Sequence, residues 1–439
     1  MPAATDTKLV RAIGRWSLTA LMINSTIGSG IFGFPSIISG MLGFASIWAY
    51  LFAGGIIGVV ILCFAEVGSQ FRESGGIYLY TRTAFGRFGG ILTGWMSWLT
   101  RITSAAANAN LFVIYLAEFW PGAKQPLLRL LILFALVGVL ATINVRGVRG
   151  GAGVSNFFAV AKLVPLAIFI VLGAAYMARS HVSLPIALPS ASGAGGKVWL
   201  DAIVLLVFAF GGFDGIVHAA GEIKNPRRDV PFALLGGLAV VTFAYTLIQV
   251  VVLGTLPIGS TTDRPLAAAA QVFMGPAGAA LMSLAALISV YGYFSAQMVV
   301  TPRLTFGLAE HDDFPPAFGR VHPRFRTPYV SILAFAALTL ILASLGSFKW
   351  NAVLSVAARL VCYLLGCAAL PVLRRKQPQA NAFRLPAGSA FSLLGMGLCL
   401  LLISRLDQTA IIILSITAGI AGLNWLWARQ RTASAPDAL

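Results

Sequence analysis

Long, continuous runs of apolar residues cover most of this 439-residue chain, and short polar segments separate them. A helix needs roughly 20 apolar residues to cross about 30 Å of hydrocarbon, so the pattern predicts about twelve membrane-spanning helices. The runs do not alternate between polar and apolar positions, which excludes a transmembrane β-barrel. The predicted spans are residues 17–40, 44–70, 88–120, 127–145, 155–178, 199–222, 231–256, 277–309, 328–346, 350–373, 389–404 and 408–428.

The composition supports an all-α polytopic membrane protein. Apolar residues make up 58% of the chain and charged residues 10%, with a mean hydropathy of +0.86, whereas a soluble domain carries about 25% charged residues. The first apolar run continues into a full span, so we expect insertion into the membrane and no cleaved signal peptide. We expect no cofactor and no metal, because the four cysteines lie in predicted spans without metal-ligand spacing. These cysteines are Cys63, Cys362, Cys367 and Cys399.

The formal net charge of +17 invites a nucleic-acid-binding interpretation, but the distribution of the cations argues against it. With the N-terminus in the cytoplasm, 21 of the 31 Lys and Arg residues fall in cytoplasmic segments, 7 fall outside and 3 lie within spans. This asymmetry follows the positive-inside rule. It predicts a protein of the cytoplasmic (inner) membrane with both termini cytoplasmic and with no nucleic-acid partner. The outer cations are Lys124, Arg129, Arg179, Lys197, Arg264, Lys349 and Arg405.

Glycines interrupt the first and the sixth predicted spans at Gly28–Phe32 and Gly211–Gly215. Glycine in a helix interior costs about 1 kcal/mol and permits unwinding. Interrupted segments at corresponding positions of two halves are typical of inverted-repeat transporters with a substrate site at the membrane midplane. The alternative is that both glycine groups are close-packing seams between helices.

Four motifs in order give the chain a family resemblance. They are Ile27–Phe32 (IGSGIF), Glu73–Tyr80 (ESGGIYLY), Gly221–Pro231 (GEIKNPRRDVP) and Asp312–Pro316 (DDFPP). The chain resembles the amino acid–polyamine–organocation transporters, and is similar to bacterial amino acid permeases and to the acidic amino acid and cystine–glutamate exchangers. The resemblance implies a LeuT-like fold: two inverted five-helix repeats plus two extra helices, with helices 1 and 6 unwound at midplane.

The fold implied by the resemblance divides the chain into five parts. We expect an N-terminal cytoplasmic segment, two repeats of five helices, a final pair of helices and a disordered cytoplasmic tail. Their bounds are 1–16, 17–180, 181–376, 377–430 and 431–439.

The resemblance also implies where the backbone of an amino acid substrate binds. Its α-carboxylate is expected on amides in the unwound middle of helix 1, which should run from Ser25 to Gly30, at the positive end of a half-helix. Its α-ammonium is expected on carbonyls in helix 6, where Phe208 is the expected gate. The residues assigned to this part of the site are Ser25, Ile27, Gly28, Ser29, Gly30, Ile31, Phe208, Ala209 and Gly211.

Two titratable residues are candidates for proton coupling. Lys162 in helix 5 matches a lysine that several family members carry where sodium-driven relatives hold a sodium ion, so transport is expected to be sodium-independent. Burial disfavours the charged form of such a lysine, and it also disfavours the charged form of Asp214 in the helix 6 break. The alternatives are that Lys162 braces the carbonyls of helix 1, and that Asp214 is a counter-ion or a helix cap.

Arg101 and Arg359 suggest the substrate class, because charges at bilayer depth are expensive and usually mark a binding site or a pathway. Two guanidinium groups in one cavity favour an anion between them, and arginine recognises carboxylates bidentately. The alternative is internal neutralisation: Arg101 by Glu66 or Asp214, and Arg359 by helix-end carbonyls. We expect Glu66 to pair with a loop cation. The further residues assigned to this distal end of the pocket are Ala105, Gln297 and Ser355.

Together these features predict a secondary active transporter of acidic amino acids (glutamate, aspartate or cystine), working as a proton symporter or an exchanger. One alternative is a carrier of small neutral amino acids, and a second is a non-transporting sensor or partner subunit on the same fold. An enzyme is not expected, since no nucleophile–base pair appears in the loops. Expected partners are the amino acid, protons and membrane lipid, with the chain a monomer or a weak homodimer.

Overall fold

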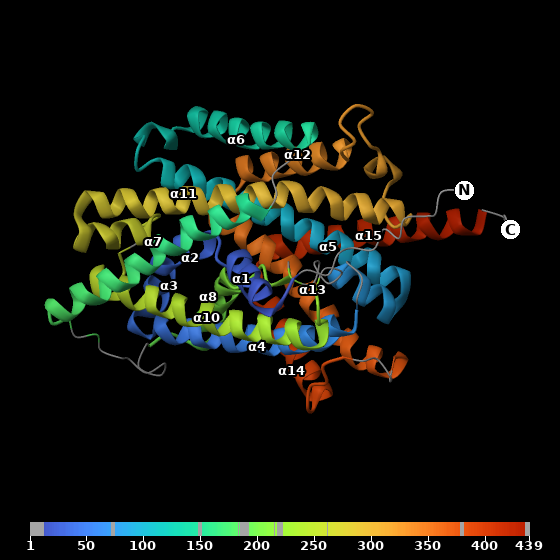
Figure 1. Ribbon diagram of the computed structural model, residues 1–439, viewed down its shortest axis with the longest axis horizontal. Helices are drawn as coiled ribbons and strands as arrows, with labels where there is room; N and C mark the ends of the chain where they lie inside the picture. Colours follow the sequence, from blue (N-terminus) through green and yellow to red (C-terminus); the bar gives the residue numbers. More distant parts are fainter. Residues whose placement is uncertain are drawn as a thin grey trace.

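The computed structural model describes residues 13–71, 75–147, 152–182, 184, 193–214, 216, 223–260, 262–377 and 382–434, and within them the chain is a bundle of helices (Figure 1). The only extended pairing in this part is an isolated bridge between Ile13 and Ile223. The helices are α1 (Arg15–Thr26), α2 (Ser29–Gly33), α3 (Pro35–Leu42), α4 (Ser46–Gln70), α5 (Gly76–Leu116), α6 (Pro126–Arg146), α7 (Ala152–Arg179), α8 (Gly196–Ala209), α10 (Pro226–Thr255), α11 (Pro265–Glu310), α12 (Tyr329–Leu345), α13 (Phe348–Lys376), α14 (Gly388–Ile403) and α15 (Gln408–Ser434).

Each predicted span contains helix in the part of the chain that the structure describes, which confirms the polytopic all-α architecture. Seven helices are long and apolar enough to cross a membrane, and α12 and α14 are shorter apolar helices. The first span is divided into α1, α2 and α3, and the sixth begins with the 14-residue α8. Because the helix is interrupted in both spans, neither α1 nor α8 is by itself long enough to cross a membrane.

Two of the longest helices contain a glycine kink. In α5 the kink is at Gly86 (φ 80°), and in α11 it is at Gly275 (φ 66°). A side chain at positive φ would be strained, so glycine is the residue that permits these turns. Each kink separates a short helical segment from the membrane-spanning part of the same helix, close to the predicted starts at residues 88 and 277.

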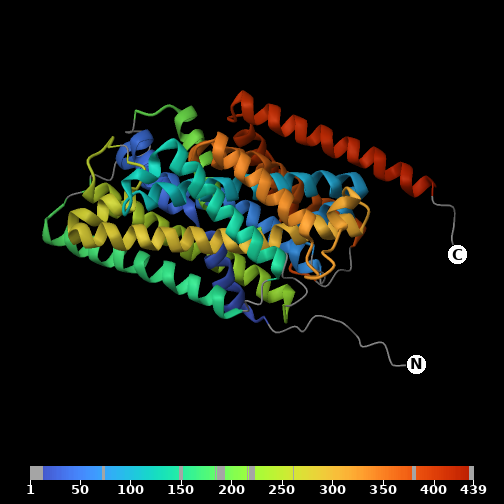
Figure 2. The ribbon, with the colours of Figure 1, turned by 90° about the horizontal axis from the view of Figure 1, so that it is seen from above.

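The broken helices lie in the middle of the bundle. Figure 1 shows α1, α2 and α8 surrounded by longer helices, with α6 and α12 on one outer side and α14 on the opposite one. In the interior, α13 packs along α5, α10 packs along α4 and α1, and α11 packs along α5 and α7. Figure 2 shows α15 on the outside of the bundle, where its C-terminal half diverges from the other helices. It continues to Ser434, past the end predicted at residue 430.

One end of the bundle collects cations around two buried carboxylates. Asp313, which is fully buried, accepts from Arg87 at 2.7 Å and lies 3.1 Å from Arg82. The buried Glu66 accepts two hydrogen bonds from Arg374, each at 2.6 Å. Glu66 therefore pairs with a cation as expected, but Arg374 lies in the last turn of α13 and not in a loop. We call this end of the bundle, which also carries Arg429 and Arg431 at the end of α15, the basic end.

The opposite end holds cations that the sequence placed outside the membrane. Lys124 lies 3.2 Å from Asp263, and Arg264 pairs with Glu118 across the same connection. The separation of these pairs from the basic end agrees with the charge asymmetry that predicted the orientation of the chain.

Candidate functional site

The first helix break lies between α1 and α2. Ile27 and Gly28 leave helical geometry, and the helix resumes at Ser29. The prediction of an unwound stretch from Ser25 to Gly30 was too long, because Ser25 is still part of α1 and Gly30 is already part of α2. Side chains from α7 and α10 bind the carbonyl groups exposed at the end of α1, so the helix remains regular up to the break itself.

Lys162 on α7 supplies one of these partners. Its Nζ donates to the carbonyl of Asn24 and, at 2.7 Å, to that of Ile27, and the residue is 4% exposed. A buried ammonium group has to be hydrogen-bonded, and these carbonyls provide the acceptors. The contact is the brace of helix 1 that the sequence left open as an alternative. The role of Lys162 in proton coupling stays a prediction.

Tyr245 on α10 joins the two breaks. Its hydroxyl lies 3.2 Å from the carbonyl of Thr26 at the end of α1 and 3.1 Å from that of Ala209 at the end of α8. The side chain is fully buried. Sequence reasoning missed this residue, because nothing in the pattern of an apolar span singles out one tyrosine. Ala209 was expected to face the substrate ammonium, and its carbonyl already has this partner.

The second break follows α8 and lies directly against the first. A Cβ atom added to Gly30 would lie 2.6 Å from Cα of Ala209, and one added to Gly212 (φ 113°) would lie 2.3 Å from the carbonyl oxygen of Ser25. The glycines therefore serve both purposes that the sequence suggested: they interrupt the helices and they let the two backbones approach. This contact lies in the middle of the bundle, where the substrate site is expected (Figure 1).

Arg101 on α5 is held beside the second break. Its Nη2 lies 3.8 Å from Oδ2 of Asp214, and its Nη1 donates to Oε1 of Gln297 on α11 at 3.1 Å. The Arg101 and Asp214 side chains are 9% and 19% exposed. The structure thus brings together three residues that the sequence had assigned to the site. Of the two carboxylates that could neutralise Arg101, Asp214 is the one in contact with it, and Glu66 pairs with Arg374.

Arg359 on α13 approaches the same break from another side. A Cβ atom at Gly211 would lie 1.1 Å from Nη1 of Arg359, so the guanidinium fills the space that a side chain would need there. The residue is 5% exposed, and its Nε has no hydrogen-bond partner among the described residues. Asp214 and Tyr363 are among the groups that act electrostatically on its charge. Two arginines therefore share one carboxylate in this part of the described structure.

Tyr293 on α11 completes the wall around the first break. Its hydroxyl forms a 2.8 Å hydrogen bond with Ser104 on α5, and its ring edge lies 3.8 Å from the position of a Cβ at Gly28. Ser29, the first residue of α2, is buried and its hydroxyl has no partner among the described residues. A ligand between Tyr293 and α2 would satisfy that hydroxyl.

Phe208 belongs to an aromatic cluster on the side of the breaks away from the basic end. Its ring makes edge contacts with Phe34 (5.8 Å between centroids) and Phe348 (6.1 Å). Phe348 starts α13 next to Lys349, one of the cations expected outside the membrane. The cluster lies on that side of the breaks, and the role of Phe208 as a gate stays a prediction.

Two predicted pocket residues lie between helices. Ser355 donates to the carbonyl of Thr100 at 2.9 Å, and Ala105 is fully buried. The Ser355 hydroxyl is used in the contact between α13 and α5, and Ala105 packs in an apolar cluster. Neither side chain therefore presents a free polar group to a ligand. Ile31 is also fully buried, and can contribute only its backbone amide. His218, the histidine that follows the second break in the sequence, lies outside the described residues.

Within the described ranges, no group of three or more His, Cys, Asp or Glu residues could hold a metal ion. The four cysteines are unpaired and buried. The chemistry of the site therefore comes from two guanidiniums, one carboxylate, one ammonium and the backbone of two broken helices.

Comparison with known proteins agrees with this arrangement. The sequence profile described as "Amino acid permease" matches residues 13–420. The chain is similar to a serine/threonine exchanger of Bacillus subtilis (28% identity, covering 95% of this chain and 96% of that protein) and to a branched-chain amino acid permease of the same organism (26%, 93% and 90%). It is also similar to an uncharacterized transporter of Mycobacterium tuberculosis (31%, 85% and 82%).

Proposed function

Because the chain belongs to the amino acid permease family, a family of membrane transporters, we propose that it carries amino acids with an anionic side chain, of the glutamate and aspartate type, without sodium. Amino acid transport through a multi-pass membrane protein follows from the family. The choice of side chain rests on the charged groups beside the second helix break.

The balance of charge in the site is the observation that supports an anionic substrate. Among the described residues of the site, Arg101 and Arg359 carry two positive charges and Asp214 supplies one negative charge. Nε of Arg359 has no partner in that part of the chain, and a buried donor without a partner costs about 1–3 kcal/mol. A second carboxylate, delivered by the substrate, would neutralise the remaining charge and accept from this guanidinium.

The rest of the substrate fits the first break. The α-carboxylate of an amino acid would lie at the start of α2, where the hydroxyl of Ser29 is unsatisfied. The α-ammonium would face the carbonyls that end α8. We place Phe208 over this position as the gate, since its aromatic partners close the side away from the basic end.

Two residues are candidates for coupling to protons. Lys162 already donates to the end of α1, so a sodium ion at this place would face a like charge. Release of its proton would free the carbonyls of α1 and could be linked to reorientation of the helix. Asp214→Asn should flatten the pH profile of uptake if that carboxylate carries the proton, and an unchanged profile would assign the proton to another group.

A carrier of small neutral amino acids is the second candidate, and a specific contact favours it. Asp214 already lies 3.8 Å from Arg101, so part of the positive charge is neutralised without a substrate. Two of the relatives carry names that refer to neutral amino acids, serine and threonine in one case and branched-chain amino acids in the other. In this case the arginines hold the broken helix in place.

Paired ligands distinguish the two candidates. Glutamate and glutamine have nearly the same shape and differ in side-chain charge, so we would compare their effects on the melting temperature of the purified chain. A ligand at 100 times its Kd stabilises by about 2.7 kcal/mol. Stabilisation by glutamate alone, lost in Arg359→Gln and kept in the peripheral variant Arg405→Gln, supports the anionic site. Stabilisation by serine or glutamine in preference to glutamate would establish the neutral carrier.

A further inference from the structure

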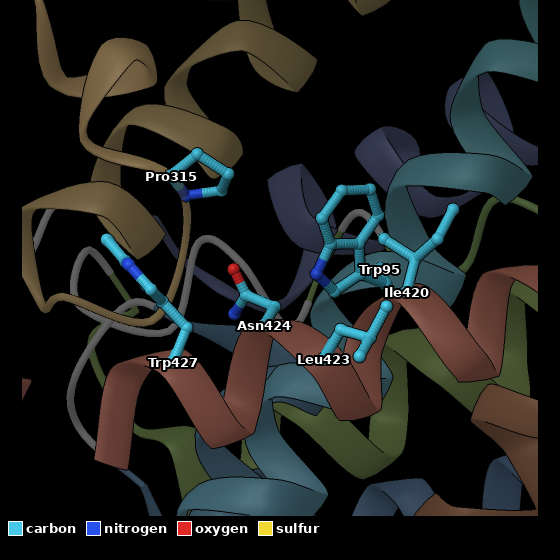
Figure 3. Close-up of a pocket in the computed structure, with 6 residues that line it drawn as sticks. All are labelled: Trp95, Pro315, Ile420, Leu423, Asn424 and Trp427. Atoms are coloured by element: carbon cyan, nitrogen blue, oxygen red, sulfur yellow. The ribbon is translucent and has the colours of Figure 1, made fainter. Parts of the chain in front are cut away.

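A groove outside the two helix breaks lies between the outer helix α15, the membrane-spanning part of α5 and the connection from α11 to α12 (Figure 3). Its volume is about 290 Å³. It is lined by Trp95, Pro315, Ile420, Leu423, Asn424 and Trp427.

The lining combines an apolar wall with a small polar edge. Leu423 and Ile420 are 69% and 41% exposed, so the apolar wall opens outward from the bundle. Figure 3 shows the indole nitrogen of Trp95 turned toward the interior of the groove, with the amide of Asn424 standing opposite it. That nitrogen is buried and has no hydrogen-bond partner among the described residues. Such a groove fits a long apolar group.

The position of the groove along the bundle is fixed by the basic end. Nδ2 of Asn424 donates to the carbonyl of Asp313 at 2.9 Å, and Arg87 reaches the carbonyl of Ala428 at 3.2 Å. Burial and the hydrogen bond to Asp313 raise the pKa of Tyr78, which therefore stays a neutral donor in this network. The groove thus lies next to the basic end, the end that the charge asymmetry assigns to the cytoplasmic surface of the membrane.

A cation lies beside one wall of the groove. The guanidinium of Arg431 lies 4.4 Å from the ring centre of Trp427, which lines the groove, and that of Arg429 lies 5.8 Å from the ring centre of Trp425, which does not. Both arginines are exposed. Arg431 therefore presents a positive charge next to the groove.

We propose that this groove binds one anionic phospholipid from the leaflet at the basic end, which the charge asymmetry makes the cytoplasmic leaflet. An acyl chain lies against Leu423, Ile420 and the ring of Trp95, and the phosphate lies beside Arg431. Free phosphate would leave the apolar wall empty, and a zwitterionic lipid would bring its own cation to the phosphate beside Arg431. The site is separate from the amino acid site and does not depend on the substrate proposed for it.

The test is native mass spectrometry of the purified full chain in detergent, with palmitoyl-oleoyl phosphatidylglycerol or the phosphatidylcholine of the same chains added. We expect one phosphatidylglycerol to remain bound, with an affinity about fivefold above that for phosphatidylcholine, the effect of one arginine at an anionic surface. Arg431→Gln should abolish this preference, and Arg429→Gln, which removes the same charge two residues away, should keep it.

A second pair of variants tests the apolar wall independently of charge. Leu423→Trp fills the groove and should release both lipids, whereas Leu426→Trp makes the same change at an exposed position of α15 that does not line the groove. Equal melting temperatures of the lipid-free variants check their folding. Equal effects of Arg431→Gln and Arg429→Gln, or lipid binding unchanged by Leu423→Trp, would overturn the proposal. So would a dimer that Leu423→Trp dissociates, because the occupant would then be a second copy of the chain.

Discussion

Asp214 provides the sharpest perturbation of the site, because it is the carboxylate that the substrate would have to complement or replace. Asp214→Asn keeps the size of the side chain and removes its charge. Arg101, at 3.8 Å, and Arg359, beside Gly211, then face each other without an anion. If the substrate has an anionic side chain, two results should follow. Without ligand, Asp214→Asn should be less stable than the unmodified chain, and it should bind glutamate more tightly.

The magnitude follows from the geometry. Two unit charges about 4 Å apart interact by about 4 kcal/mol at an effective dielectric constant of about 20. Water recovers part of that interaction when the carboxylate is removed. The coupling between the internal carboxylate and a bound anion should therefore be about 1–3 kcal/mol, which is about a 5- to 150-fold decrease in the Kd for glutamate.

Isothermal titration of glutamate and of glutamine into the purified chain measures this coupling. Glutamine is the control, because it lacks the charge that competes with Asp214, and its affinity should change little. The double variant Asp214→Asn, Arg101→Gln should return the glutamate affinity toward that of the unmodified chain. Equal or weaker glutamate binding by Asp214→Asn would refute the reasoning and would leave the arginines as supports of the broken helix.

Three further outcomes follow from contacts of the two breaks. Gly211→Ala should displace Arg359 and weaken glutamate binding, whereas Gly236→Ala, with open space around it, should not, as a binding titration of both variants would show. Tyr245→Phe should lower the free energy of unfolding by about 1–3 kcal/mol, since two buried carbonyls lose a donor; an unchanged melting temperature would contradict the bridging role. Lys162→Ala should abolish uptake against a gradient in proteoliposomes, and retained pH-dependent accumulation would exclude a coupling role.

The sequence predicts the architecture well because the signals are local. Each membrane-spanning helix is a continuous apolar run, and the glycines of both breaks are visible as interruptions in such runs. The pairing of Glu66 with a cation could also be predicted, because a carboxylate near the end of an apolar span needs a charged partner. These inferences require no knowledge of which helices touch.

The partners inside the site could not be predicted in the same way. Tyr245 and Tyr293 are single tyrosines in apolar spans, and only the packing of α10 and α11 against the breaks gives them a role. The break in helix 1 is shorter than predicted because Lys162 and Tyr245 bind the carbonyls at the end of α1. Whether Arg101 faces Glu66 or Asp214 likewise depends on the placement of helices far apart in the sequence.

Counterflow in proteoliposomes tests the central claim most directly, because it reports transport and selectivity together. Vesicles loaded with unlabelled glutamate and diluted into sodium-free buffer with a trace of labelled glutamate should accumulate the label transiently. Aspartate should compete, glutamine and serine should not, and Arg359→Gln should abolish the accumulation. Counterflow of labelled serine with no response to glutamate would show that the chain is a neutral amino acid carrier and that its arginines are structural.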